Sequence, residues 1–123
     1  MPIKPLTAQT LSALLSRIDN ARYGEVRSVS ALSSSSIEVQ LSAQDIARGY
    51  DWIDVAFRID GVRDAKLVSD NVLEMLDMRE GISVSIDNEG CALAIGGYSG
   101  REGEAPFYIL GTSLGYEELP FSG

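Results

Sequence analysis

The chain has 123 residues, and hydrophobic residues make up 45% of it, which is enough apolar surface to offset chain entropy and excludes a disordered chain. Its net charge is −8, from 18 acidic and 10 basic residues. Because contacts to phosphate groups need a basic surface, this charge excludes direct binding of nucleic acid. We expect residues 1–123 to fold as a single domain around one core.

The first segment predicts an amphipathic helix that begins after Thr7 and runs to about Ala21. Thr7 is a residue type favoured at the N-cap, and Gly24 supplies a stop. The apolar residues that recur at the spacing of one helical face are Leu11, Leu14, Leu15 and Ile18. We expect this face to pack on the rest of the domain.

Alternation with a period of two begins after this helix and predicts antiparallel strands. Residues 25–32 and 37–41 form a hairpin, and a loop over 42–49 holds one helical turn around residues 44–47. The segment 52–59 places Ile53, Val55, Phe57 and Ile59 on one face and Trp52, Asp54, Ala56 and Arg58 on the other. The pair Asp60 and Gly61 predicts a tight turn, with 62–68 as the returning strand.

The second half continues the β pattern after residues 69–78, which fit either a short helix or an irregular crossover. Residues 82–86 and 91–95 predict a hairpin closed by the turn 87–90, and 107–114 is the last strand. The fold class is therefore α+β, with the N-terminal amphipathic helix packed on a mainly antiparallel sheet of about six or seven strands. A β-sandwich with a peripheral helix is the alternative.

The residue types needed for common catalytic sites are scarce. The chain has no histidine and one cysteine, Cys91, which excludes Ser-His-Asp and Cys-His arrangements and the usual zinc ligand sets. We expect a reduced, buried thiol at Cys91, no catalytic residue, no metal and no cofactor. A carboxylate-dependent enzyme stays open through pairs such as Asp51 and Asp54, but on a strand these two point to opposite faces.

The termini and apolar runs predict a cytoplasmic protein. Residues 1–10 carry no apolar stretch of the kind found in a secretory signal, and no segment approaches the ~20 apolar residues of a membrane span. We therefore expect neither secretion nor a membrane partner.

Two segments carry residue types that protein interfaces favour. The first is an aromatic and acidic patch around the start of the strand 52–59, and the second is the glycine-rich loop 96–103, which lacks the Lys-Ser/Thr ending of a phosphate loop. The predicted partner-binding residues are Tyr50, Trp52, Asp54, Tyr98, Arg101, Glu102 and Glu104. The partner that fits an acidic surface is a basic protein.

Several short runs between residues 51 and 97 resemble a known group of proteins. The runs are Asp51-Trp52-Ile53, Phe57, Leu76-Asp77-Met78-Arg79-Glu80-Gly81-Ile82-Ser83 and Gly96-Gly97-Tyr98. They are similar to small bacterial immunity proteins of polymorphic and contact-dependent toxin systems. The resemblance implies a non-catalytic cytosolic antidote that covers the active site or substrate groove of its cognate toxin, often a nuclease.

The leading hypothesis is thus an immunity protein that neutralises a basic toxin by direct binding. A homo-oligomeric adaptor or assembly subunit is the alternative, using an exposed sheet edge or the helix face of Leu11 and Leu15. A carboxylate-dependent enzyme is the third hypothesis.

Overall fold

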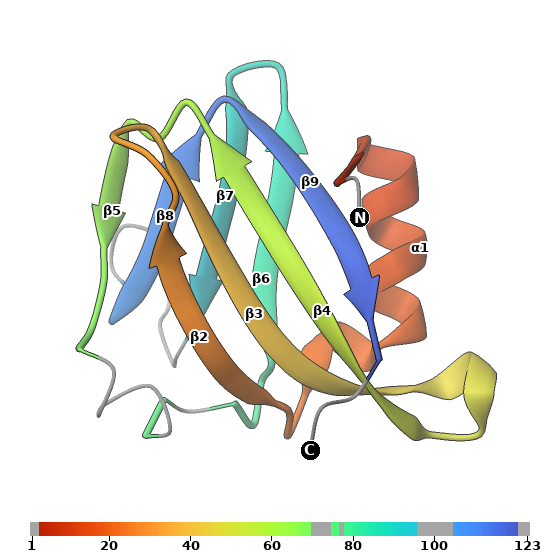
Figure 1. The fold of residues 1–123 in the computed structure, drawn as a ribbon. Coiled ribbons are helices and arrows are strands. Elements are labelled where there is room, and N and C mark those ends of the chain that lie inside the picture. The colour runs from red at the N-terminus through yellow and green to blue at the C-terminus, as the bar shows by residue number, and fades with distance from the viewer. Residues whose placement is uncertain (1–2, 70–74, 77, 96–104, 121–123) are drawn as a thin grey trace.

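The computed structural model describes residues 3–69, 75–76, 78–95 and 105–120. Its strands form two antiparallel sheets, one in the order β1-β9-β4-β3-β2 and the other in the order β5-β8-β7-β6. The two sheets lie as layers, and the helix α1 (Ala8–Arg17) stands beside them and packs against β6 (Figure 1). The α+β class is confirmed, and the described strands are divided between two sheets, as in the sandwich alternative.

The bounds of the remaining elements follow the chain order. They are β1 (Lys4–Pro5), the short 3₁₀ turn η1 (Asp19–Ala21), β2 (Glu25–Ala31), β3 (Ser36–Asp45), the 3₁₀ turn η2 (Ile46–Arg48), β4 (Asp51–Asp60), β5 (Asp64–Lys66), β6 (Ile82–Asp87), β7 (Gly90–Ile95), β8 (Phe107–Gly111) and β9 (Ser113–Leu119).

The N-terminal helix begins where the sequence predicts and ends earlier. The Thr7 side chain caps the helix and forms a reciprocal capping box with Thr10. The helix stops at Arg17 because residues 19–21 adopt positive φ values of 50°, 53° and 57°, which a right-handed helix excludes. The chain therefore turns away before the Ala21 end that the periodicity predicts.

Two predicted hairpins are confirmed. β2 pairs with β3, and β6 pairs with β7 in the register Ile82 to Ile95. β3 runs on to Asp45, however, and pairs with β4 along its full length. The expected loop over 42–49 is thus reduced to the η2 turn and its flanking residues, and the β3–β4 hairpin is longer than predicted.

The prediction that 62–68 returns along the preceding strand is wrong, and the single last strand predicted over 107–114 is divided in two. β5 does not return along β4 but pairs with β8 in the other sheet, and the last segment forms two strands, β8 and β9, one in each sheet. The chain passes from one sheet to the other after β4 and again after β8, and these two crossings lie at one corner. There Thr112 N donates to Asp60 O at 2.9 Å and Thr112 Oγ1 donates to Gly61 O at 3.3 Å. Most of 69–78 lies outside the described residues.

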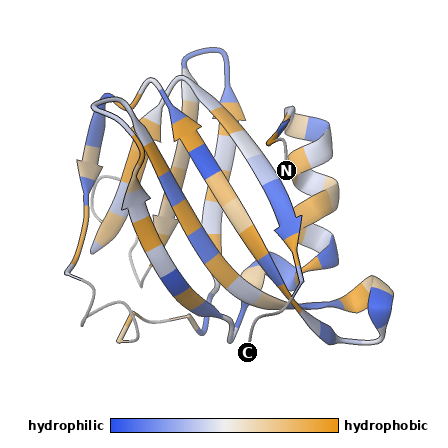
Figure 2. Ribbon diagram, in the orientation of Figure 1, coloured by the Kyte–Doolittle hydropathy of each residue, from blue (hydrophilic) through white to orange (hydrophobic). Residues whose placement is uncertain are grey.

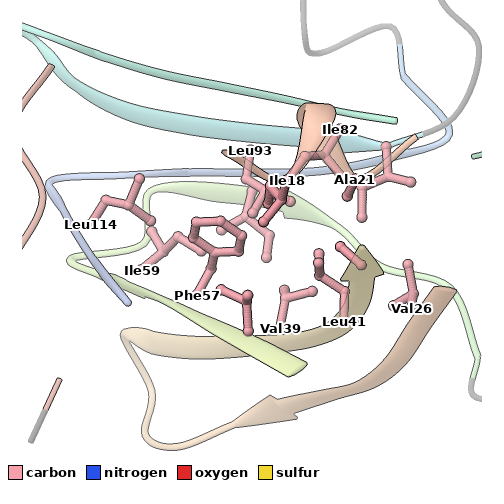
Figure 3. Packing of buried hydrophobic residues seen from close by; sticks show 14 of the residues in the cluster. Ile18, Ala21, Val26, Val39, Leu41, Phe57, Ile59, Ile82, Leu93 and Leu114 are labelled. Atoms are coloured by element: carbon pink, nitrogen blue, oxygen red, sulfur yellow. The ribbon is translucent and has the colours of Figure 1, made fainter. Parts of the chain in front are cut away.

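The apolar core fills the space between the two sheets. β3 and β4 present alternate apolar side chains to it, among them Val39 and Phe57, and β7 contributes Leu93 from the opposite sheet (Figures 2 and 3). Ile18, the C-cap of α1, and Ala21 of η1 enter the same cluster. The core thereby holds the helix end and both sheets as one packed unit.

Cys91 lies in this core and is 4% exposed. Burial is the main reason that the pKa of its thiol is raised above 9.0, so the group stays protonated at neutral pH. The predicted burial of Cys91 is confirmed. None of the helices in the described ranges is long and apolar enough to cross a membrane.

Truncation of the central aromatic residue tests the packing. Phe57 is 0% exposed, so Phe57→Ala should lower the free energy of unfolding by about 3–5 kcal/mol, from lost burial and the cavity left behind. Urea unfolding followed by circular dichroism measures the change. As a control, Leu32→Ala at an exposed position should change it by less than about 0.5 kcal/mol, and equal effects of the two variants would contradict this core.

Candidate functional site

The long β3–β4 hairpin projects past the edge of the sheets and ends in a tip that we define as residues 44–52 (Figure 1). Three large apolar side chains of the tip are exposed, namely Ile46 at 43%, Tyr50 at 59% and Trp52 at 40%. Exposed aromatic residues concentrated on a projecting element are typical of protein interfaces. The hairpin tip is therefore the candidate functional site.

The backbone of the hairpin tip is strained at one residue. Gly49 and Tyr50 have φ values of 66° and 69°, in the left-handed region that glycine adopts freely. For tyrosine this conformation costs about 1–2 kcal/mol. It is held because Tyr50 N donates to Asp45 O at 2.9 Å and Gln44 Nε2 donates to Tyr50 O at 3.3 Å. Such strain clusters at functional positions.

A fully buried carboxylate, Asp45, lies at the base of the hairpin tip. Arg17 binds it with two hydrogen bonds, from Nε to Oδ1 at 3.0 Å and from Nη2 to Oδ2 at 2.9 Å. Ala47 N donates to the same carboxylate at 3.0 Å, which makes Asp45 the N-cap of η2. The Arg17 pKa is raised, first by this hydrogen bond to Asp45 and also by Glu118.

The outer face of the five-stranded sheet continues from the hairpin tip, and no described helix crosses it (Figure 1). Strand register places the carboxylates of Glu38, Asp60 and Glu117 on this face, which we call the open face. Asp60 accepts a hydrogen bond from Ser36 Oγ at 2.6 Å and pairs with Arg58 Nε at 3.2 Å. The Ser36 hydroxyl is the largest cause of the lowered pKa of Asp60.

Asp54 shares the strand face of Trp52 but does not reach solvent. It is 0% exposed, and Ser42 Oγ donates to its Oδ1 at 2.5 Å while Gln40 Nε2 lies 3.5 Å from Oδ2. These neighbouring donors offset the loss of hydration, so the carboxylate is tolerated on this face without exposure to water. The expected aromatic and acidic patch is corrected accordingly, because Tyr50 and Trp52 are accessible and Asp54 is not.

Four of the predicted partner-binding residues fall in a segment that the structure does not describe. Tyr98, Arg101, Glu102 and Glu104 lie outside the described residues. Asp51 is exposed and Asp54 is buried on the opposite face of β4, so the structure does not bring this carboxylate pair together. Over the described ranges, no group of three or more Cys, Asp or Glu side chains could hold a metal ion.

A groove of about 350 Å³ lies between α1 and β6. Its walls include Leu11 and Leu15 from the helix and Val84 and Ile86 from the strand, together with serine side chains and Asn20. No charged side chain lines it. The groove thus offers an apolar shape without the charged groups that orient a polar substrate.

Sequence reasoning missed three residues of the site: Ile46, Arg17 and Asp45. An available signal was Asp45 followed four residues later by Gly49, the pattern of a short turn with an acidic N-cap and a left-handed glycine end. No local pattern indicated that Arg17 would pair with a carboxylate 28 residues away.

No known protein family, curated protein or solved structure matches this chain.

The hydrogen bond from Ser36 to Asp60 should make the free energy of unfolding depend on pH. The folded Asp60 pKa lies below 3.8, so its stabilising contribution is present above the unfolded pKa and is lost as pH falls through the folded value. Ser36→Ala should move the Asp60 pKa upward, as measured by carboxyl ¹³C NMR titration. Ser36→Ala should have a lower free energy of unfolding than the unmodified protein, and this difference should be largest at neutral pH and shrink in acid. An unmoved Asp60 pKa would contradict the assignment.

Proposed function

We propose that the protein is a non-catalytic binding protein of the cytoplasm, an immunity protein that neutralises a cognate bacterial toxin by direct binding. The observation that carries the proposal is the projecting hairpin tip, with Ile46, Tyr50 and Trp52 exposed. A nuclease is the toxin class that fits an acidic inhibitor best, because enzymes that act on nucleic acid bind phosphates with basic surfaces.

The aromatic side chains supply the anchoring part of such an interface. Tyrosine and tryptophan are enriched among the residues that dominate binding energy, since they bury a large area at a low cost in conformational entropy. Tyr50 and Trp52 are already exposed and held on a hairpin, so they can enter a pocket of the partner without rearrangement of the core.

The open face supplies the electrostatic part. The chain carries a net charge of −8, and Glu38 and Glu117 form no ion pair with any described residue. Carboxylates of this kind attract a basic partner over a distance set by the ionic strength and speed its capture. Partner binding should therefore weaken in high salt.

The alternative of a homo-oligomer is disfavoured at the edge formed by β2. β2 is an edge strand, but a bulge between Val26 and Ser28 interrupts its register, and Arg27 pairs with Glu25 at 3.4 Å on the same strand. Bulges and charged side chains are features that protect an edge from pairing with another chain.

The test is direct binding to the product of the neighbouring reading frame, with variants of the hairpin tip. Trp52→Ala and Tyr50→Asn should each weaken the complex by about 2 kcal/mol or more, roughly 30-fold in Kd. Asparagine accepts the left-handed backbone of Tyr50, so this variant should keep its thermal stability while losing the ring. Isothermal titration calorimetry measures Kd, and thermal unfolding checks the fold.

Leu32→Ala is the matched control, because Leu32 is an exposed apolar residue away from the hairpin tip, at the far end of the β2–β3 hairpin. It should bind like the unmodified protein. Absence of any complex, together with failure to rescue cells from the neighbouring product, would remove the immunity proposal. A complex unaffected by the two tip variants would place the interface elsewhere.

A further inference from the structure

The hairpin tip is fastened to the rest of the molecule through Asp45. Its side chain caps η2 by accepting from Ala47 N at 3.0 Å, and its carbonyl oxygen accepts from Tyr50 N at 2.9 Å. One residue thus holds both sides of the turn that presents Ile46 and Tyr50. Asp45 thereby supplies two of the hydrogen bonds that fix the turn, beside those from Gln44 Nε2 to Tyr50 O and from Gly49 N to Ile46 O.

The Asp45 carboxylate is itself positioned by α1. Arg17, the last residue of that helix, holds both carboxylate oxygens at 2.9 and 3.0 Å, and its Nη2 also contacts Glu118 Oε1 of β9 at 2.5 Å. Two parallel bonds from a planar guanidinium fix orientation as well as distance, which a lysine ammonium cannot do. Helix, sheet and hairpin tip therefore meet at one guanidinium group.

We propose that Arg17 and Asp45 are positioning residues that hold the hairpin tip in its binding conformation. This inference rests on the proposed function in so far as the hairpin tip contacts the partner. Without Arg17, the buried Asp45 charge would keep only the exposed Arg48 as a cationic partner, with Nε 3.5 Å from Oδ2 and one contact in place of two paired bonds. The carboxylate would then move toward water and release the Ala47 and Tyr50 amides. A turn that is ordered before binding avoids the entropic cost of ordering during binding, and this raises affinity.

The first arm of the test needs no partner. Amide hydrogen exchange by NMR should show the Ala47 and Tyr50 amides exchanging at least about tenfold faster in Arg17→Ala than in the unmodified protein. Arg17→Lys, which keeps the charge without the paired bonds, should give an intermediate rate. Exchange at Phe57, in the middle of β4, should stay unchanged.

Glu118→Gln is the matched control, because it alters the other carboxylate on Arg17 and leaves the Asp45 contacts in place. Its Ala47 and Tyr50 amides should exchange as in the unmodified protein. Unchanged exchange in Arg17→Ala would overturn the inference. Acceleration of Phe57 to the same degree would also overturn it, since that result would mark a general loss of stability.

The second arm measures binding of the same variants to the purified product of the neighbouring reading frame. Arg17→Ala should raise Kd about tenfold, and Glu118→Gln should leave it unchanged. If the unmodified protein binds and Arg17→Ala binds equally well, positioning is refuted while the immunity proposal stands. If the unmodified protein does not bind, the immunity proposal fails, and the exchange rates alone decide whether Arg17 holds the turn.

Discussion

The buried carboxylate of Asp45 is the group on which the shape of the hairpin tip depends. A charge with no exposure to water is strongly unfavourable unless ion pairing and hydrogen bonds replace its hydration. Arg17, the Ala47 amide and, at 3.5 Å, Arg48 supply that replacement. The bonds from Arg17 and Ala47 tie the end of α1 to the turn after β3. The packed sandwich behind this contact supplies the rigidity that a projecting hairpin lacks by itself.

Local sequence patterns predicted much of the fold. The rest could not be predicted, because it depends on strand pairing between segments that are distant in sequence. The periodicity of the first helix and the hairpin 82–95 depended on residues close in sequence, and the structure confirms both. The turn at Gly61 was also found, but a turn signal does not show which sheet the next strand joins. That choice depends on β8, more than 40 residues later, and on the corner formed with Thr112.

The candidate site was also predicted only in part, because some of its features depend on contacts between segments distant in sequence. Strand alternation placed Trp52 on the outward face of β4, and it is exposed. Alternation placed Asp54 on the same face but could not show its burial, which depends on the hydroxyl of Ser42 across the β3–β4 ladder. The contact of Arg17 with Asp45 joins two elements distant in sequence, so only the folded structure reveals it.

If Arg17 and Asp45 fix the hairpin tip, it stands in one conformation before any partner binds. Backbone ¹⁵N relaxation of the free protein measures this directly at the amides of Ala47, Gly49 and Tyr50. A turn fixed in this way should give order parameters of about 0.85, the value of rigid backbone. Values below about 0.6 at these three amides, with a rigid β4, would contradict it.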